Sequence, residues 1–115
     1  MTKPIAPKPK GLPPAEVKPL LELIAYQDGA VVSRQLVTKS TGNVTLFAFD
    51  QYQGLSEHTA PFDALVHVLE GAAEITVSGA PHEVKAGEII LLPAAQPHAV
   101  KALTRFKMLL TMIRS

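Results

Sequence analysis

The chain has 115 residues, enough for one domain with a single modest core. Hydrophobic residues make up 47% of it, as is typical of a folded globular protein, and eleven basic against ten acidic residues leave a net charge of +1. This small excess of charge, together with only 5% aromatic residues, argues against a nucleic-acid-binding surface.

The absence of cysteine narrows the chemistry further. Without a thiol, the chain forms no disulfide and no zinc ribbon, so a metal ion would need histidine, carboxylate or amide ligands. No apolar stretch reaches the roughly 18 residues that a membrane helix needs, and the N-terminus lacks the apolar run of a secretory signal. We therefore expect a cytoplasmic protein that binds neither nucleic acid nor membrane.

Residues 1–19 form the first segment, which contains six prolines and four lysines. Because proline fixes φ and has no N–H, we predict an extended N-terminal segment rather than a regular helix. Two interpretations stay open, namely a loose tail or strap over the domain, and a proline-rich ligand for the groove of a partner. Residues 20–115 are predicted to form one domain.

Short apolar runs separated by turn residues fill this domain. They cover residues 20–26, 30–39, 44–50, 64–71, 72–79, 82–93, 98–103 and 105–113. The first run is ambiguous, since a short helix also fits it. The runs are rich in Val, Ile, Leu, Phe and Thr, and turn signals recur roughly every 8 to 14 residues, which predicts an all-β sandwich or barrel.

Two runs alternate clearly enough to predict which side chains face a core. The predicted core-facing residues are Ala73, Ile75 and Val77 in one run, and Phe106, Met108, Leu110 and Met112 in the last. The last run is apolar on both faces, with Leu109 and Ile113 on the other side. A strand that also packs against a partner subunit would explain this pattern, so we expect a homodimer.

Gly87, Pro93 and His98 stand in the stretch GEIILLPAAQPHAVKA at the spacings of the second motif of the cupin family, which this stretch resembles. Ala95 replaces the second glycine of that motif, and Ala102 replaces its asparagine. The pattern makes physical sense, because a glycine permits a turn into a strand and a proline ends a strand where no ladder N–H is needed. The histidine then enters the next strand, where its side chain can point into a barrel.

The first cupin motif, two histidines, a glutamate and a closing glycine, is only partly present. Gly71 matches the closing glycine. The shorter spacing within the motif places His58, Ala60 and Ala64 at the first histidine, the second histidine and the glutamate, and the longer spacing places Glu57, Thr59 and Ala64 there. The resemblance covers about residues 40 to 113.

The resemblance implies a cupin-type double-stranded β-helix, or jelly-roll, barrel with an extended proline-rich N-terminal tail. It also implies a divalent metal site, for Zn, Mn, Fe, Ni or Co, in which His58 and His98 are the remaining ligands. Glu57, Asp63 and Gln53 are further candidate ligands near the same rim. A β-bulge would turn the Asp63 carboxylate inward, whereas a regular strand would leave it in solvent. No organic cofactor is expected.

The other two histidines are assigned different places. If residue 64 points into the barrel, so do residues 66 and 68, and His67 then points outward, toward solvent or a subunit interface. His82 lies beside a turn and is expected to be exposed.

Three functional hypotheses remain, and they leave open whether the protein is an enzyme. The first is metal binding at His58 and His98 with a small molecule in the barrel, for an oxygenase, isomerase or lyase reaction. The second is a metal-free binding or sensor protein, whose pocket Ala60 and Ala64 enlarge. The third is a structural protein that binds a partner through its tail and outer sheet face.

Overall fold

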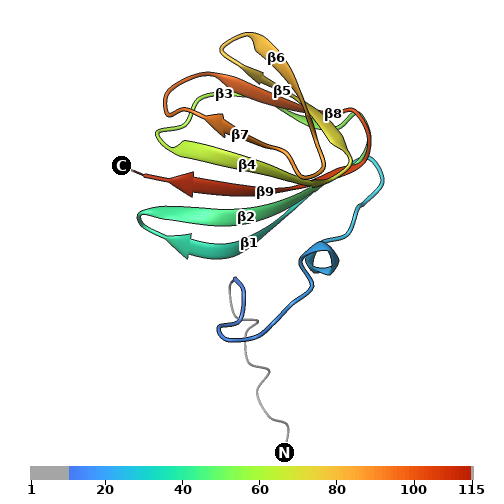
Figure 1. The fold of residues 1–115 in the computed structure, drawn as a ribbon, viewed down its shortest axis with the longest axis vertical. Helices are drawn as coiled ribbons and strands as arrows, with labels where there is room; N and C mark the ends of the chain where they lie inside the picture. The colour runs from blue at the N-terminus through green and yellow to red at the C-terminus, as the bar shows by residue number, and fades with distance from the viewer. Residues whose placement is uncertain (1–10, 115) are drawn as a thin grey trace, which may run out of the picture.

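The computed structural model describes residues 11–114. In this range it contains one 3-10 helix, η1 (Leu20–Leu23), and nine strands (Figure 1). The strands are β1 (Val31–Lys39), β2 (Gly42–Phe49), β3 (Gly54–His58), β4 (Asp63–Glu70), β5 (Ala72–Val77), β6 (Ala80–Lys85), β7 (Ile89–Leu92), β8 (His98–Ala102) and β9 (Phe106–Ile113). No helix in the described range is long and apolar enough to cross a membrane.

The strands form two antiparallel sheets that face each other, as Figure 1 shows. The order is β1-β2-β9-β4-β7 in the five-stranded sheet and β3-β8-β5-β6 in the four-stranded sheet. Consecutive strands repeatedly pass from one sheet to the other, which is the jelly-roll arrangement. The all-β jelly-roll barrel predicted from the sequence is confirmed.

The main core lies between the two sheets. Phe49 of β2 and Phe106 of β9 are fully buried there, and their rings stack with centroids 4.5 Å apart. Ala73 and Ile75 of β5 are also fully buried, as their alternation predicted. The alternation of β9 likewise turns the side chain of Met108 into this core.

A second apolar cluster lies on the outer face of the five-stranded sheet. It consists of Ile24, Leu36, Leu46 and Ala48, with Leu12, Leu20, Leu23, Tyr26, Val32, Val44, Leu69 and Leu109 packed against it. Segment 12–26 therefore crosses this face as a strap. The strap covers Leu109 within a single chain. Leu109 therefore no longer supports the expected homodimer, for which it was one of the arguments. Ile113, in contrast, remains 59% exposed.

Polar contacts fix the strap to the strands beneath it. The Leu12 N–H donates to the Leu36 carbonyl at 2.7 Å, and the Lys107 Nζ donates to the Leu21 carbonyl at 2.7 Å. Tyr26 donates its hydroxyl proton to Glu70 at 2.5 Å. The predicted N-terminal segment covered residues 1–19. Its residues 12–19 belong to the strap, and its residues 1–10 lie outside the described range.

Residues 20–26, for which a short helix was left open, form η1 and an extended segment. Two other elements differ from the sequence prediction. The run 82–93 is divided between β6 and β7 by a turn in which Gly87 has φ +86. Strand β3 was not predicted, because four of its five residues are exposed and it carries no apolar alternation.

Candidate functional site

Two histidines meet at the edge of the four-stranded sheet. His58 ends β3 and His98 begins β8, and the two residues are register partners. Their Nε2 atoms are 3.1 Å apart, and their rings meet edge to face at 69°. Antiparallel pairing of β3 with β8 thus brings together residues that are 40 positions apart.

Each histidine is oriented by a backbone carbonyl two residues before it. The His58 Nδ1 lies 2.8 Å from the Ser56 oxygen, and the His98 Nδ1 lies 3.2 Å from the Gln96 oxygen. Since a carbonyl only accepts, these contacts assign the proton of each neutral ring to Nδ1. Each Nε2 atom then carries a lone pair, and two lone pairs at 3.1 Å repel each other unless a cation or a proton lies between them.

Burial favours the neutral form of His98. Its side chain is almost entirely enclosed, and this desolvation lowers the pKa of His98 below its ordinary value. The Gln96 carbonyl acts in the opposite direction, and a positive charge on His58 would lower the pKa further. Neutral imidazole is the form that coordinates a metal ion.

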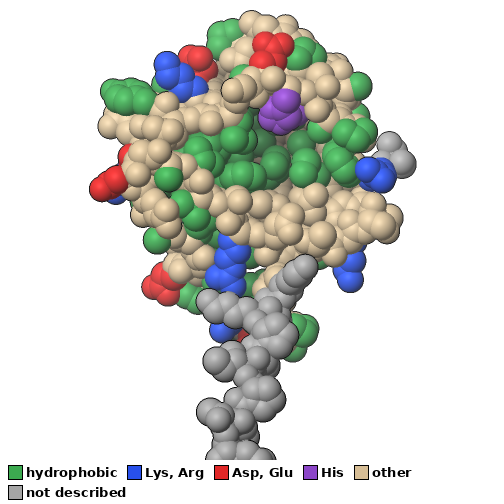
Figure 2. Space-filling model, turned by 180° about the vertical axis from the view of Figure 1, so that it is seen from behind, with side chains coloured by type: hydrophobic (Ala, Val, Ile, Leu, Met, Phe, Trp, Pro, Cys, Tyr) green, Lys and Arg blue, Asp and Glu red, His purple; other side chains and the backbone are tan. Residues whose placement is uncertain are grey.

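The histidine pair borders a recessed cavity of about 180 Å³. Its lining residues come mainly from β3, β4, β8 and β9: Phe47, Leu55, His58, Ala60, Ala64, Val66, Leu92, His98, Val100, Met108, Leu110 and Met112. Figure 2 shows a face of the molecule that is hollowed in the middle, with hydrophobic side chains in the hollow and a histidine beside it. The barrel interior therefore contains an apolar pocket, and His58 and His98 supply its polar side-chain atoms.

Of the two spacings considered for the first cupin motif, the shorter one matches the residues that line this pocket. His58, Ala60, Ala64 and His98 all line the cavity, whereas Glu57 and Thr59, which the longer spacing would use, do not. Two of the four positions that carry ligands in the family motif are thus occupied by methyl groups.

The three additional candidate ligands lie outside the pocket lining. Glu57 is exposed on β3, and Gln53 lies in the turn before that strand. The Asp63 carboxylate accepts a hydrogen bond from the Ala94 N–H at 2.9 Å. Pairing of β4 with β9 is regular from residue 63 to residue 68, so no bulge turns Asp63 inward. Within residues 11–114, no group of three or more His, Asp or Glu side chains is placed to hold a metal ion.

The remaining histidines lie where strand parity and turn position put them. His67 is opposite Leu109 and Ile89 on the outer face of the five-stranded sheet, while its neighbours Val66 and Val68 are fully buried. His82 is exposed on β6.

Ala95, at the second glycine position of the motif, has a left-handed backbone conformation. Its φ is +64, and its N–H donates to the Ala60 carbonyl at 2.8 Å. This bond ties the loop before His98 to the loop after His58. The alanine accepts a backbone conformation that costs a non-glycine residue about 1–2 kcal/mol.

Sequence reasoning missed most of the pocket wall. Met108, Leu110 and Met112 were correctly predicted to face the core, but the pocket that the same side chains line was not predicted. Leu55 was missed with its strand. The available signal was the pair of alanines opposite a row of long side chains, because small residues leave space in a barrel.

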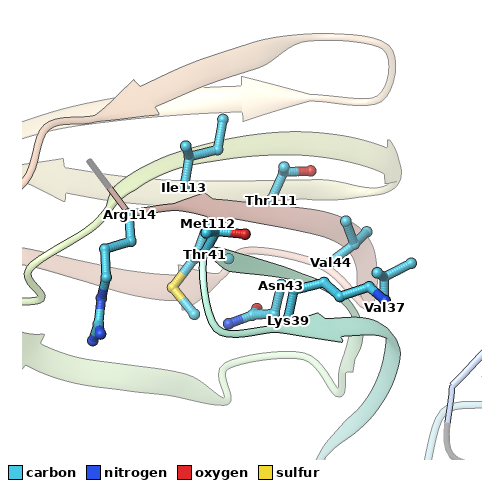
Figure 3. Close-up of a pocket in the computed structure, with 10 residues that line it drawn as sticks. Val37, Lys39, Thr41, Asn43, Val44, Thr111, Met112, Ile113 and Arg114 are labelled. Carbon is cyan, nitrogen blue, oxygen red and sulfur yellow. The ribbon is translucent and has the colours of Figure 1, made fainter.

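A second, more open hollow of about 310 Å³ lies at the ends of β1, β2 and β9. Figure 3 shows Val37, Val44, Thr111 and Ile113 around it, with Lys39 and Arg114 at its edges. It contains no histidine and no carboxylate among its lining residues.

A family model for the cupin domain matches residues 46–113, more than half of the chain. The chain belongs to the cupin family. No curated protein matches it. This cupin is similar to a conserved protein of unknown function from Streptococcus pyogenes, with 33% identity, a TM-score of 0.87, and coverage of 92% of this chain and 93% of the other.

Two further solved structures extend the comparison. A cupin superfamily protein from Desulfitobacterium hafniense has 29% identity and a TM-score of 0.85, over 92% of this chain and 97% of the other. A cupin 2 conserved barrel domain protein from Leptotrichia buccalis has 43% identity and a TM-score of 0.80, over 82% of this chain. This cupin covers only 46% of that longer protein. None of the three descriptions names a reaction.

Proposed function

We propose that this cupin binds one divalent metal ion, Zn, Mn, Fe, Ni or Co, through His58 and His98, beside a small molecule held in the barrel. The observation that carries the proposal is the pair of Nε2 atoms, 3.1 Å apart with both Nδ1 atoms turned to carbonyls. A carbonyl partner on the far nitrogen is the usual support of a metal-binding histidine.

The distance between the two nitrogens fits a shared ion. Metal–imidazole bonds are about 2.0–2.1 Å long, so two adjacent ligands of one ion lie roughly 3.0–3.4 Å apart. The His58 and His98 rings meet this requirement without a change of rotamer. The geometry therefore resembles half of a metal site rather than two unrelated histidines.

The other half of the coordination sphere is not supplied by the lining residues, because Ala60 and Ala64 have no donor atom. We expect weaker binding than at a site with four protein ligands, and several positions open to water and to the bound molecule. An ion in this place would polarise an oxygen atom of that molecule.

The chain itself contributes binding and orientation. The apolar walls exclude water from the molecule in the barrel, and the two carbonyl contacts hold the imidazoles in place. No Asp, Glu, Lys, Ser, Tyr or Cys is present among the lining residues, so the histidines are the available proton-transfer groups there. Oxygenase, isomerase and lyase reactions all remain compatible with this arrangement.

Metal titration of the untagged protein tests the proposal. We expect about one ion per chain, measured by calorimetry and by elemental analysis after purification without chelator. His58→Ala and His98→Ala should each weaken binding at least tenfold, because each removes half of the protein ligands. His82→Ala is the control, because His82 is exposed and does not line the pocket.

A variant with higher metal affinity provides a complementary test. Ala60→His adds a third imidazole to the same pocket and should tighten binding at least tenfold. Equal metal content in the wild type and in the variants of His58, His98 and His82 would contradict the proposal.

A metal-free ligand-binding or sensor protein is the second candidate function. It is favoured by the two alanines at ligand positions and by the apolar wall around them. Failure to bind metal after incubation with each divalent ion would favour this candidate.

A further inference from the structure

The pocket offers polar contacts in one place only. Of its twelve lining residues, ten are hydrophobic, and His58 and His98 provide all of the polar side-chain atoms. The hydrophobic wall runs from Leu55 and Val100 on one sheet to Met108, Leu110 and Met112 on the other. A molecule that enters the barrel therefore meets hydrocarbon and sulfur everywhere except at the histidine pair.

This wall selects against polyhydroxylated molecules. A hydroxyl group in the apolar part of the pocket loses its hydrogen bonds to water and finds no replacement. Each such group weakens binding, typically by about tenfold or more. Sugars and sugar acids are thus poor occupants.

The volume sets the size of the occupant. About 180 Å³ is slightly more than the roughly 150 Å³ of an apolar protein cavity that holds one benzene molecule, and less than the roughly 300–1,000 Å³ of most ligand pockets. A molecule of roughly 6 to 10 non-hydrogen atoms fits this space.

The two neutral imidazoles that would hold the ion determine which charge the bound molecule should carry. This step rests on the proposed metal site. A divalent ion held by two neutral imidazoles keeps its full charge of 2+. Among the described lining residues there is no carboxylate to balance it. In a low-dielectric pocket such a charge is costly, and an anionic ligand relieves the cost.

We propose that the small molecule of this site is a monocarboxylate with a hydrocarbon body of this size. Its carboxylate lies beside the histidine pair, on the ion that His58 and His98 would hold, and its body lies against Met108, Leu110 and Met112. The alanines at positions 60 and 64 provide the space for that body.

Three compounds of nearly equal size test the proposal on the zinc-loaded protein by calorimetry. Benzoate combines the charge with the hydrocarbon body, benzyl alcohol has the body without the charge, and threonate has the charge with a polyhydroxylated body. We expect benzoate to bind at least tenfold more tightly than either of the others.

Two alanine variants locate the binding. Ala64→Leu fills the pocket and should weaken benzoate binding at least tenfold while zinc remains bound. Ala86→Leu changes an exposed turn residue and should have no effect. If Ala64→Leu does not fold, Ala60→Leu at the partly exposed rim of the same pocket replaces it.

The outcomes separate this proposal from the metal site. Zinc binding without a preference for benzoate would overturn the ligand class and leave the metal site standing. A preference for benzoate in protein that binds no zinc would overturn the metal site and leave the ligand class standing. Threonate or benzyl alcohol binding as tightly as benzoate would overturn the proposed ligand.

Discussion

Gly71 shows how one residue of a family motif is required by packing rather than by chemistry. It lies between β4 and β5 with φ +75, and a Cβ atom there would collide with the Arg105 carbonyl and come within 2.8 Å of both the Phe106 Cβ and the Thr104 hydroxyl. The closing glycine of the motif thus allows the turn to pack against the start of β9.

The substitution Gly71→Ala should therefore be strongly destabilising. A positive φ costs alanine about 1–2 kcal/mol, and the collision with backbone adds a similar amount, so we expect a loss of about 3 kcal/mol in the free energy of unfolding. Urea denaturation measures this loss.

Gly79→Ala is the matched control for that prediction. Gly79 has φ +81, but a Cβ atom there would meet nothing within 4 Å. Its loss should be limited to about 1–2 kcal/mol. Equal losses in the two variants would show that crowding at Gly71 is unimportant.

At the scale of the element, Asp50 connects the turn before β1 to the end of β2 and the start of β9. It follows β2 and accepts hydrogen bonds from the Gly29 N–H at 2.7 Å and from the Arg105 Nε at 2.7 Å. Arg105 also pairs with Asp28 at 2.5 Å. The Gly29 N–H, then Arg105 and the Gln51 N–H, lower the pKa of Asp50 to about 2.

This shift predicts that acid weakens the fold through Asp50. The ordinary pKa is 3.8, so the unfolded chain binds the proton more strongly than the folded chain, and stability falls as the pH falls through this range. The wild type should unfold at a higher temperature than Asp50→Asn at pH 6, and the difference should disappear toward pH 2.

Thermal unfolding at a series of pH values provides the measurement. Glu83→Gln serves as a control, since Glu83 is exposed and lies 4.0 Å from its nearest cation. A difference between the wild type and Asp50→Asn that stays constant from pH 6 to pH 2 would contradict the prediction.

Strands with an apolar side were predictable from the sequence, and β3 was not. Alternation located β5 and β9 because their inward side chains are hydrophobic, whereas β3 exposes Glu57 and His58 and is held by its pairing with β8. Only part of the candidate site could be predicted from the sequence. Motif spacing identified the residues, but the cavity depends on how far apart the two sheets hold them.

At the scale of the molecule, the strap covers only part of the outer face of the five-stranded sheet. One row of register partners crosses all five strands on this face: Val37, Val44, Thr111, Leu65 and Leu91. Its members Val37, Leu65 and Leu91 are 42%, 38% and 55% exposed. An uncharged row across a whole sheet is typical of an interface.

The homodimer expected from the sequence therefore stays a prediction, with this row as its surface in place of Leu109. We expect the wild type to sediment as a dimer and the double variant Leu65→Asp, Leu91→Asp as a folded monomer, because four carboxylates would be buried at the interface. Val17→Asp is the control, since Val17 is fully exposed outside the sheet. A monomeric wild type at micromolar concentration, or a double variant that remains dimeric, would exclude the row as the dimer surface. Circular dichroism of the double variant distinguishes dissociation from unfolding.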